Sequence, residues 1–161
     1  MDRFWGLVGG DAFADLCPDP SRGRAQSGFA RRFPDDAIEV WARFTSLIPE
    51  DEQDDLIKAY HRRLFSGDLS VEQRYGRAWA AWENALASIH STGGSHEGPA
   101  DYARAFSRLE NHYFTNAGFL EFDGQILAHM SRISHIPGVI VQGRYDMICP
   151  PSSAYELAEN W

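Results

Sequence analysis

The chain has 161 residues, of which 43% are hydrophobic and 13% aromatic, enough for one globular domain or for one domain and part of another. Its 15 basic and 23 acidic residues give a net charge of −8, which argues against binding to nucleic acid or to an anionic membrane. Cys17 and Cys149 have no disulfide-framework or metal-site spacing, so we expect a reduced, cytoplasmic protein without a metal.

The first 35 residues read as irregular. The apolar run near Met1 is too short to span a membrane and too weak for a signal peptide. The stretch CPDPSRGRAQSG (17–28) is rich in Pro, Gly, Ser and Arg, residues typical of loops. We therefore expect regular structure to begin after Pro34.

Amphipathic helices are predicted along most of the remaining chain. Apolar residues recur there at spacings of three and four, which places them on one face of each helix. Acidic residues, Ser and Pro stand where the helices should begin. The expected starting points are Asp35 or Asp36, Pro49, about Ser70, Pro99, Gln125 (to Ile133), and Ser152 or Ser153.

A strand is predicted near the C-terminus, in PGVIVQGRYDMICP (137–150). Gly138–Val141 is a short apolar, β-branched run, and it is followed by turn residues around Asp146. Such a strand belongs in a parallel sheet with both faces covered. No good partner strand is visible in the sequence, and unpaired buried backbone groups are costly. We infer that the sheet is missing from this chain.

Five ordered segments, between residues 26 and 161, carry a family resemblance. These are FPDDAIEVW (33–41), IPEDEQDDLIKAYHRRL (48–64), AWAAWENALASI (78–89), FSRLENHYFTNAGFLE (106–121) and PGVIVQGRYDMICP (137–150). Together they resemble the proline iminopeptidases (prolyl aminopeptidases), serine peptidases of the α/β-hydrolase fold. The resemblance implies an α/β-hydrolase fragment in which a mainly helical cap is followed by one late sheet strand and a final helix.

The same resemblance divides the chain into three parts. Residues 1–25 do not match the family and form an irregular leader. Residues 26–133 correspond to the helical cap that recognises substrate, and residues 134–161 to part of the hydrolase core. An altered reading frame or an unrelated leader fused to the cap would explain the junction near residue 25.

Asp146 is the candidate catalytic residue. By resemblance it occupies the position of the acid in a triad whose chain order is Ser, Asp, His. An acid at the end of a parallel strand can fix the tautomer of a histidine and stabilise the imidazolium during acyl transfer. The alternative is a turn-forming aspartate that binds its own backbone.

Glu83 and Glu110 match family glutamates that hold the free imino terminus of the substrate. An N-terminal proline is a secondary ammonium, and carboxylates in a partly dry pocket pair with it more strongly than exposed ones do. The alternative for Glu83 is a solvent-facing position on an amphipathic helix. Residues that would line the same pocket by resemblance, or pack within helices, are Trp82, Tyr113, Phe114 and Cys149.

Three other features are less suited to catalysis. His112 precedes Asp146, whereas the triad base should follow it, so we interpret His112 as packing or pocket lining. The segment GGSHEG (93–98) lacks the final glycine of G-x-S-x-G and has no preceding strand. His61-Arg62-Arg63 is expected on a solvated helix face.

The chain has no nucleophile elbow, no Gly-rich oxyanion loop and no histidine after Asp146. The family releases N-terminal proline without a metal or organic cofactor, but we expect this chain alone to be inactive. The implied partners are peptides with an N-terminal proline and a complementary hydrolase half. Two alternatives remain: a non-catalytic binder of N-terminal proline, and a helical interaction module whose exposed strand pairs with a partner's sheet.

Overall fold

The computed structural model describes residues 35–87, 98–144, 146, 149 and 151–161. The irregular leader predicted for residues 1–25 and most of GGSHEG lie outside these residues. The chain separates into two compact units, Ala30–Phe119 and a second unit that contains Leu120–Trp161. The predicted division into leader, cap and partial core stays a prediction.

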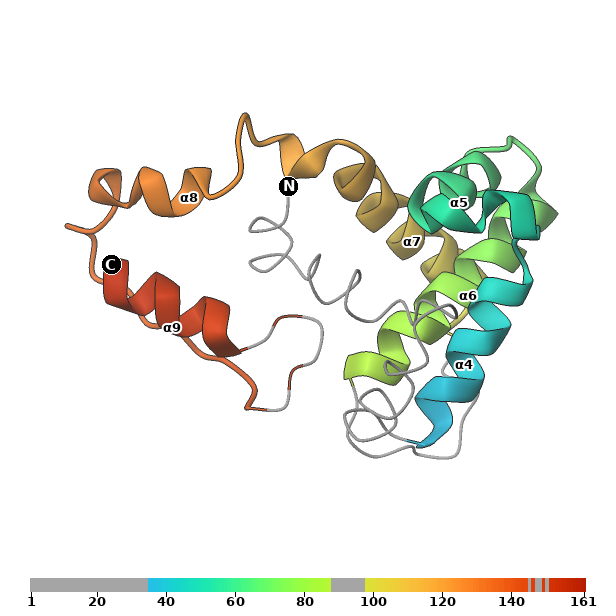
Figure 1. Cartoon of the computed structure of the whole chain (residues 1–161), viewed down its shortest axis with the longest axis horizontal. Coiled ribbons are helices and arrows are strands. Elements are labelled where there is room, and N and C mark those ends of the chain that lie inside the picture. Colours follow the sequence, from blue (N-terminus) through green and yellow to red (C-terminus); the bar gives the residue numbers. More distant parts are fainter. Residues whose placement is uncertain (1–34, 88–97, 145, 147–148, 150) are drawn as a thin grey trace. The chain divides into compact units, whose positions relative to one another are not determined.

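The unit Ala30–Phe119 is built from four α-helices and two short 3₁₀-helices, η1 and η2, in its described part (Figure 1). Helix α6 is central, since it contacts α4, α5 and α7. Helix α5 also packs against α7. The bounds are α4, Asp35–Ser46; η1, Glu50–Asp55; α5, Leu56–Leu64; α6, Leu69–Ala87; α7, Ala100–Thr115; and η2, Ala117–Phe119.

Local side-chain hydrogen bonds explain where two of these helices begin. Asp55 caps α5, because its side chain accepts a hydrogen bond of 3.0 Å from the backbone N–H of Lys58. Asp68 does the same before α6, accepting from the backbone N–H of Ser70 at 2.8 Å. Pro49 was expected to open one continuous helix; instead η1 precedes α5, and Asp55 restarts the chain as a regular α-helix.

The core of this unit is a cluster of aromatic rings from α4, α5 and α6. Phe44 and Tyr60 stack with ring centroids 4.2 Å apart, and Trp41 and Trp82 lie 4.9 Å apart. The buried Tyr60 hydroxyl donates to the carbonyl of Phe44 at 2.8 Å, so its polar atom is satisfied. Trp79 contacts Tyr60 at 5.5 Å. The predicted apolar helix faces therefore meet as expected.

A buried ion cluster joins α6 to α7. Glu72 is 2% exposed, and its carboxylate accepts hydrogen bonds from Arg104 Nε and Arg108 Nη1, each at 2.6 Å, and from the backbone N–H of Gly67 at 3.0 Å. Burial alone would raise the pKa of Glu72, but these donors outweigh burial and lower it. This carboxylate is thus fully compensated inside the helix pair.

The predicted solvated face at 61–63 is only partly solvated. Arg62 is exposed, as expected. His61 is half-buried, and its Nδ1 lies 2.7 Å from Asn111 Oδ1 of α7. Arg63 is also half-buried and donates to Glu52 at 2.7 Å. The prediction was wrong for His61 and Arg63, because α7 and η1 pack against this side of α5.

Helix α7 ends in a left-handed turn. Residues Ala117, Gly118 and Phe119 (η2) all have positive φ, at 50°, 62° and 61°. This conformation is costly for residues with a Cβ, so Ala117 and Phe119 are strained. The hydrogen bond from Phe119 N–H to the Asn116 carbonyl, at 2.8 Å, holds the turn.

The second unit, described from Leu120, contains only short elements. The helix predicted for 125–133 is divided into α8 (Gln125–Ala128) and the 3₁₀-helix η3 (Met130–Arg132). Helix α9 (Pro151–Asn160) begins close to the predicted position. Trp161 follows it, and its Nε1 donates to the Ile136 carbonyl at 2.9 Å. No helix in the described residues is both long and apolar enough to cross a membrane.

The predicted strand does not form within the described residues. Residues 137–143 have no regular secondary structure, and Val139 and Val141 are 91% and 90% exposed. The strand prediction was therefore wrong for this structure. A strand needs the N–H and C=O groups of a neighbour, and no strand is present in the described part of the chain to supply them.

Candidate functional site

Two glutamates approach each other where α6 packs against α7. Glu83 lies near the end of α6 and is 4% exposed. Glu110 lies on α7 and is half-buried, and its Oε2 accepts a hydrogen bond of 2.8 Å from Trp79 Nε1. Trp79 precedes Glu83 by one helical turn, so both side chains project from the same side of α6. The helix packing thus places the two carboxylates close enough for the charge of one to affect the ionisation of the other.

Burial and mutual repulsion make the charged form of this pair unfavourable. Burial raises the pKa of Glu83 to about 8, and the charge of Glu110 contributes in the same direction. Burial also raises the pKa of Glu110, while the hydrogen bond from Trp79 opposes that rise. Among the residues that the structure describes, no cation or hydrogen-bond donor compensates Glu83. The pair contrasts with Glu72, whose charge two arginines neutralise.

The aromatic residues predicted to line the pocket lie at different depths in the structure. Trp82 is 1% exposed, and its Nε1 has no hydrogen-bond partner within the described residues. Phe114 is half-buried, with its ring centroid 5.8 Å from that of Trp79. Tyr113 is 48% exposed and meets Phe119 edge-on. The structure therefore buries Trp82 deeply, encloses Phe114 in part and leaves Tyr113 at the surface.

The structure also places His112 at the surface. It is exposed, and its ring lies 5.2 Å from that of Phe119. The side chain of Asn116 donates to the His112 carbonyl at 2.8 Å. The contact of the His112 ring with Phe119, in the turn after α7, is consistent with a packing role for His112.

Asp146 and Cys149 belong to the second unit, in the loop before α9. Asp146 Oδ1 accepts the backbone N–H of Cys149 at 2.8 Å. Gln142 Nε2 reaches both Asp146 Oδ2, at 3.3 Å, and the Cys149 carbonyl, at 2.7 Å. These contacts match the turn-forming alternative for Asp146, and they also hold its carboxylate in a defined orientation.

Comparison with known proteins identifies relatives that share one name. No protein-family model matches the chain. Proline iminopeptidase of Xylella fastidiosa is 45% identical over 139 residues, 84% of this chain and 43% of the relative. That of Arabidopsis thaliana is 40% identical over 139 residues, 84% of this chain and 36% of the relative. That of Neisseria meningitidis serogroup A is 35% identical over 168 residues, 96% of this chain and 54% of the relative.

The chain is related to the proline iminopeptidases. This relationship confirms the family resemblance and supports its α/β-hydrolase assignment, although the described residues are mostly helical and contain no strand. The chain spans about half or less of the length of these curated relatives. The relationship by itself therefore does not assign the activity of a whole proline iminopeptidase to this chain.

The family resemblance singled out Glu83 and Glu110, and the structure brings them together across α6 and α7. It did not single out Trp79, which donates to Glu110 and was expected only as part of an apolar helix face. The signal was present in the spacing, because Trp79 and Glu83 are four residues apart. Within the described residues, no three His, Cys, Asp or Glu side chains group closely enough to hold a metal ion.

Proposed function

We propose that this chain carries the part of a serine-type proline iminopeptidase that recognises the substrate's N-terminal proline. The observation that carries the proposal is the buried pair Glu83–Glu110, which lacks a compensating cation among the described residues. Burying carboxylates without a counter-charge is expensive, so such a site favours a ligand that brings a positive charge. The relatives' name, proline iminopeptidase, supports proline as the residue that carries it.

The chemistry of an N-terminal proline fits this pair. Its imino terminus is a secondary ammonium with two N–H donors, so one can be directed to each carboxylate. Charge-assisted hydrogen bonds are stronger than neutral ones, and their strength grows in a site from which water is excluded. The half-buried ring of Phe114, one helical turn after Glu110, supplies apolar surface of the kind that a pyrrolidine ring packs against. Binding would thus neutralise the pair and cover an apolar ring together.

For Asp146 we propose the role of triad acid, supported by its match to the family segment and by the contacts that orient its carboxylate. A triad acid acts through a histidine on a nucleophilic serine. Since this chain carries no nucleophile elbow and no histidine after Asp146, it is proposed not to turn over substrate by itself. A complementary hydrolase half would have to supply these groups.

Calorimetric titration with prolinamide tests the recognition site. We expect saturable binding to the full chain, and at least a tenfold loss of affinity in Glu83→Gln and in Glu110→Gln, because each removes one charge that faces the ligand. Glu121→Gln, at an exposed position of the second unit, should bind as the parent does. N-acetylprolinamide, which has no ammonium, should not bind. Equal binding of both ligands would overturn the proposal.

Proton release gives a second measure of the same event. At pH 7 the raised pKa leaves Glu83 largely protonated, and a bound ammonium favours its ionised form. Prolinamide binding should therefore release a proton, detected as a dependence of the binding heat on the buffer's ionisation enthalpy. In Glu83→Gln this release should fall sharply. Binding without proton release would argue against a role for the pair.

Hydrolysis separates the leading proposal from a pure binder. The chain alone should release no proline from proline 4-nitroanilide above background. Adding the complementary half of a relative, expressed separately, should restore hydrolysis if Asp146 completes a triad, and Asp146→Asn should abolish that gain. If prolinamide binds but no hydrolysis is restored, the non-catalytic binder is the better description. The interaction-module alternative predicts association with that half without prolinamide binding.

A further inference from the structure

Trp79 forms a contact between α6 and α7 beside the glutamate pair. Its side chain is 1% exposed, and its Nε1 donates a hydrogen bond of 2.8 Å to Glu110 Oε2. Its ring centroid lies 5.8 Å from that of Phe114, which follows Glu110 by one helical turn of α7. Trp79 therefore contacts both a carboxylate of the pair and the aromatic ring proposed to receive the pyrrolidine.

The indole of Trp79 is held in place by the aromatic core. Its ring meets those of Phe44 and Tyr60 edge-on, with centroid distances of 6.0 and 5.5 Å. A buried ring in close-packed surroundings cannot turn without displacing its neighbours. An indole N–H is a donor and never an acceptor. This rigid group therefore offers Glu110 a hydrogen in a fixed direction.

The donor distinguishes the two carboxylates of the pair. An N–H binds an ionised carboxylate more strongly than a neutral carboxyl group, because the hydrogen bond is then charge-assisted. Glu110 has such a donor, whereas Glu83 has none among the residues that the structure describes. Glu83 is also the more deeply buried, since it is 4% exposed and Glu110 is half-buried. The geometry thus favours the charge on Glu110 and the proton on Glu83.

Titratable groups of the packed helices do not change this order. Tyr60 of α5 meets the Trp79 ring, but burial raises its pKa and its hydroxyl donates to a backbone carbonyl of α4, so it stays neutral. The histidines of α5 and α7 lie elsewhere. His61 Nδ1 is 2.7 Å from Asn111 Oδ1, and His112 is exposed.

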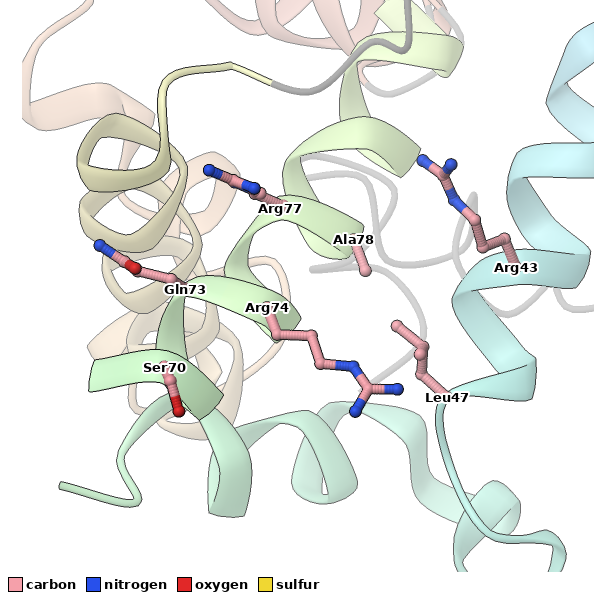
Figure 2. A pocket seen from close by; sticks show the side chains of 7 residues that line it. All are labelled: Arg43, Leu47, Ser70, Gln73, Arg74, Arg77 and Ala78. Carbon is pink, nitrogen blue, oxygen red and sulfur yellow. The ribbon is translucent and has the colours of Figure 1, made fainter. Parts of the chain in front are cut away.

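The arginines of these helices are also directed elsewhere. Arg104 and Arg108 of α7 bind Glu72. Figure 2 shows Arg43 of α4 and Arg74 of α6 extending toward the cavity between those two helices. With 3.6 residues per turn, the cavity lies on a different side of α6 from the glutamate pair. Within the described residues, the hydrogen bond from the indole is thus what makes the two glutamates unequal.

We infer that Trp79 is a positioning residue of the proposed proline site, whose N–H keeps Glu110 as the anion of the pair and leaves the proton on Glu83. This inference rests on the proposed function and adds its regulation by pH. An entering secondary ammonium meets one fixed negative charge and gains the second by displacing the proton of Glu83. Burial and the charge of Glu110 raise the pKa of Glu83 to about 8, so affinity for N-terminal proline should rise with pH up to that value.

The order of ionisation in the ligand-free chain tests this assignment. Carbon-13 NMR of the full chain, labelled in its glutamate carboxyl groups, follows each carboxyl as the pH is raised. The signals of Glu83 and Glu110 are identified by their loss in Glu83→Gln and in Glu110→Gln. We expect Glu110 to ionise at the lower pH. Ionisation of Glu83 before Glu110 would overturn the inference.

Trp79→Phe keeps an aromatic ring but removes the N–H. Glu110 should then ionise at a higher pH than in the parent, because its charged form has lost its donor. Trp82→Phe is the matched control: it removes an N–H from another position of α6 that is 1% exposed, and that N–H has no hydrogen-bond partner within the described residues. It should leave the ionisation of the pair unchanged. An equal shift in both variants, or no shift in Trp79→Phe, would contradict the assignment.

Calorimetric titration with prolinamide measures the consequence for binding. At about pH 6.5, Trp79→Phe should bind roughly tenfold more weakly than the parent and release more protons, because both carboxylates must then lose a proton. The ratio of the two affinities should shrink toward about pH 9, where the pair is mostly ionised in either protein. A ratio that is the same at every pH would show that Trp79 only supports the fold, and would overturn the inference. If the parent binds no prolinamide, the proposed function fails, while the order of ionisation still decides the role of Trp79.

Discussion

At the level of single residues, two buried glutamates of the same unit show how surroundings decide the behaviour of a carboxylate. Glu72 and Glu83 are 2% and 4% exposed. Two arginines and a backbone N–H lower the pKa of the first, whereas burial and the neighbouring Glu110 raise the pKa of the second. Glu72 therefore stabilises the helix pair in its charged form, and Glu83 is tolerated mainly in its neutral form.

Stability should accordingly depend on pH through Glu83. Its carboxyl keeps the proton to a higher pH in the folded protein than in the unfolded chain, so its contribution is fully present below about pH 4.5 and is lost as the pH rises toward 8. Glu83→Gln should remove this loss, making the variant more stable than the parent at pH 8.5 by roughly 2–4 kcal/mol.

Urea denaturation at intervals from pH 4.5 to 8.5 measures this difference. Glu121→Gln, at an exposed position, is the matched control and should follow the parent throughout. A constant difference between Glu83→Gln and the parent at every pH would mean that Glu83 is ionised in the folded protein across the whole range.

At the level of elements, the glutamate pair depends on how closely α6 approaches α7. Gly76 lies at the contact: a Cβ there would be 3.0 Å from Arg104 Cα, 3.0 Å from Ser107 Oγ and 3.2 Å from the Ala103 carbonyl. Two of these neighbours are backbone atoms, which cannot move without displacing the helix. The absence of a side chain at Gly76 thus allows the packing that brings Glu83 to Glu110.

Gly76→Ala should therefore destabilise the protein by about 1–3 kcal/mol, even though alanine favours a helix by about 1 kcal/mol over glycine. Thermal unfolding followed by circular dichroism measures the change. Arg77→Ala, at the next and exposed position, is the control for an alanine placed where it meets no neighbouring backbone, and it should have little effect. Because the helices must separate, Gly76→Ala should also weaken prolinamide binding. An unchanged or raised stability would show that the helices adjust without cost.

At the level of the whole chain, the exposed segment Val139–Val141 is a site for unwanted association. Two β-branched side chains are about nine-tenths exposed there, and no strand of the described residues pairs with their backbone. Apolar backbone segments with free hydrogen-bonding groups pair readily with other chains. Within the described residues this segment therefore has no strand partner of its own.

Val139→Lys/Val141→Lys should reduce concentration-dependent self-association while changing the free energy of unfolding by less than about 0.5 kcal/mol. Sedimentation velocity over a range of concentrations measures the first quantity, and urea denaturation the second. Ser131→Lys/Ser134→Lys adds the same charge at exposed positions of the same unit and controls for repulsion by charge alone. A large loss of stability in the valine variant would show that these side chains pack in solution.

The sequence by itself determined the helices and the family. Apolar periodicity and capping by residues such as Asp55 are local properties, so helix positions could be predicted closely. The paired glutamates were also found, through their match to family segments. The sequence did not reveal that the helix predicted for 125–133 breaks at His129. Short helices depend on their packing more than on propensity.

Only the tertiary structure decided what those residues do. Helix periodicity alone makes Glu83 an ordinary helix-surface residue, whereas the family match makes it a ligand-binding residue; burial in the fold gives it a raised pKa. Val139–Val141 reads as a strand in the sequence, yet no strand forms there in the structure, because β-structure needs hydrogen-bonding partners distant in sequence. Helix formation is satisfied within a segment, whereas burial, charge pairing and strand pairing depend on which other segments fold against it.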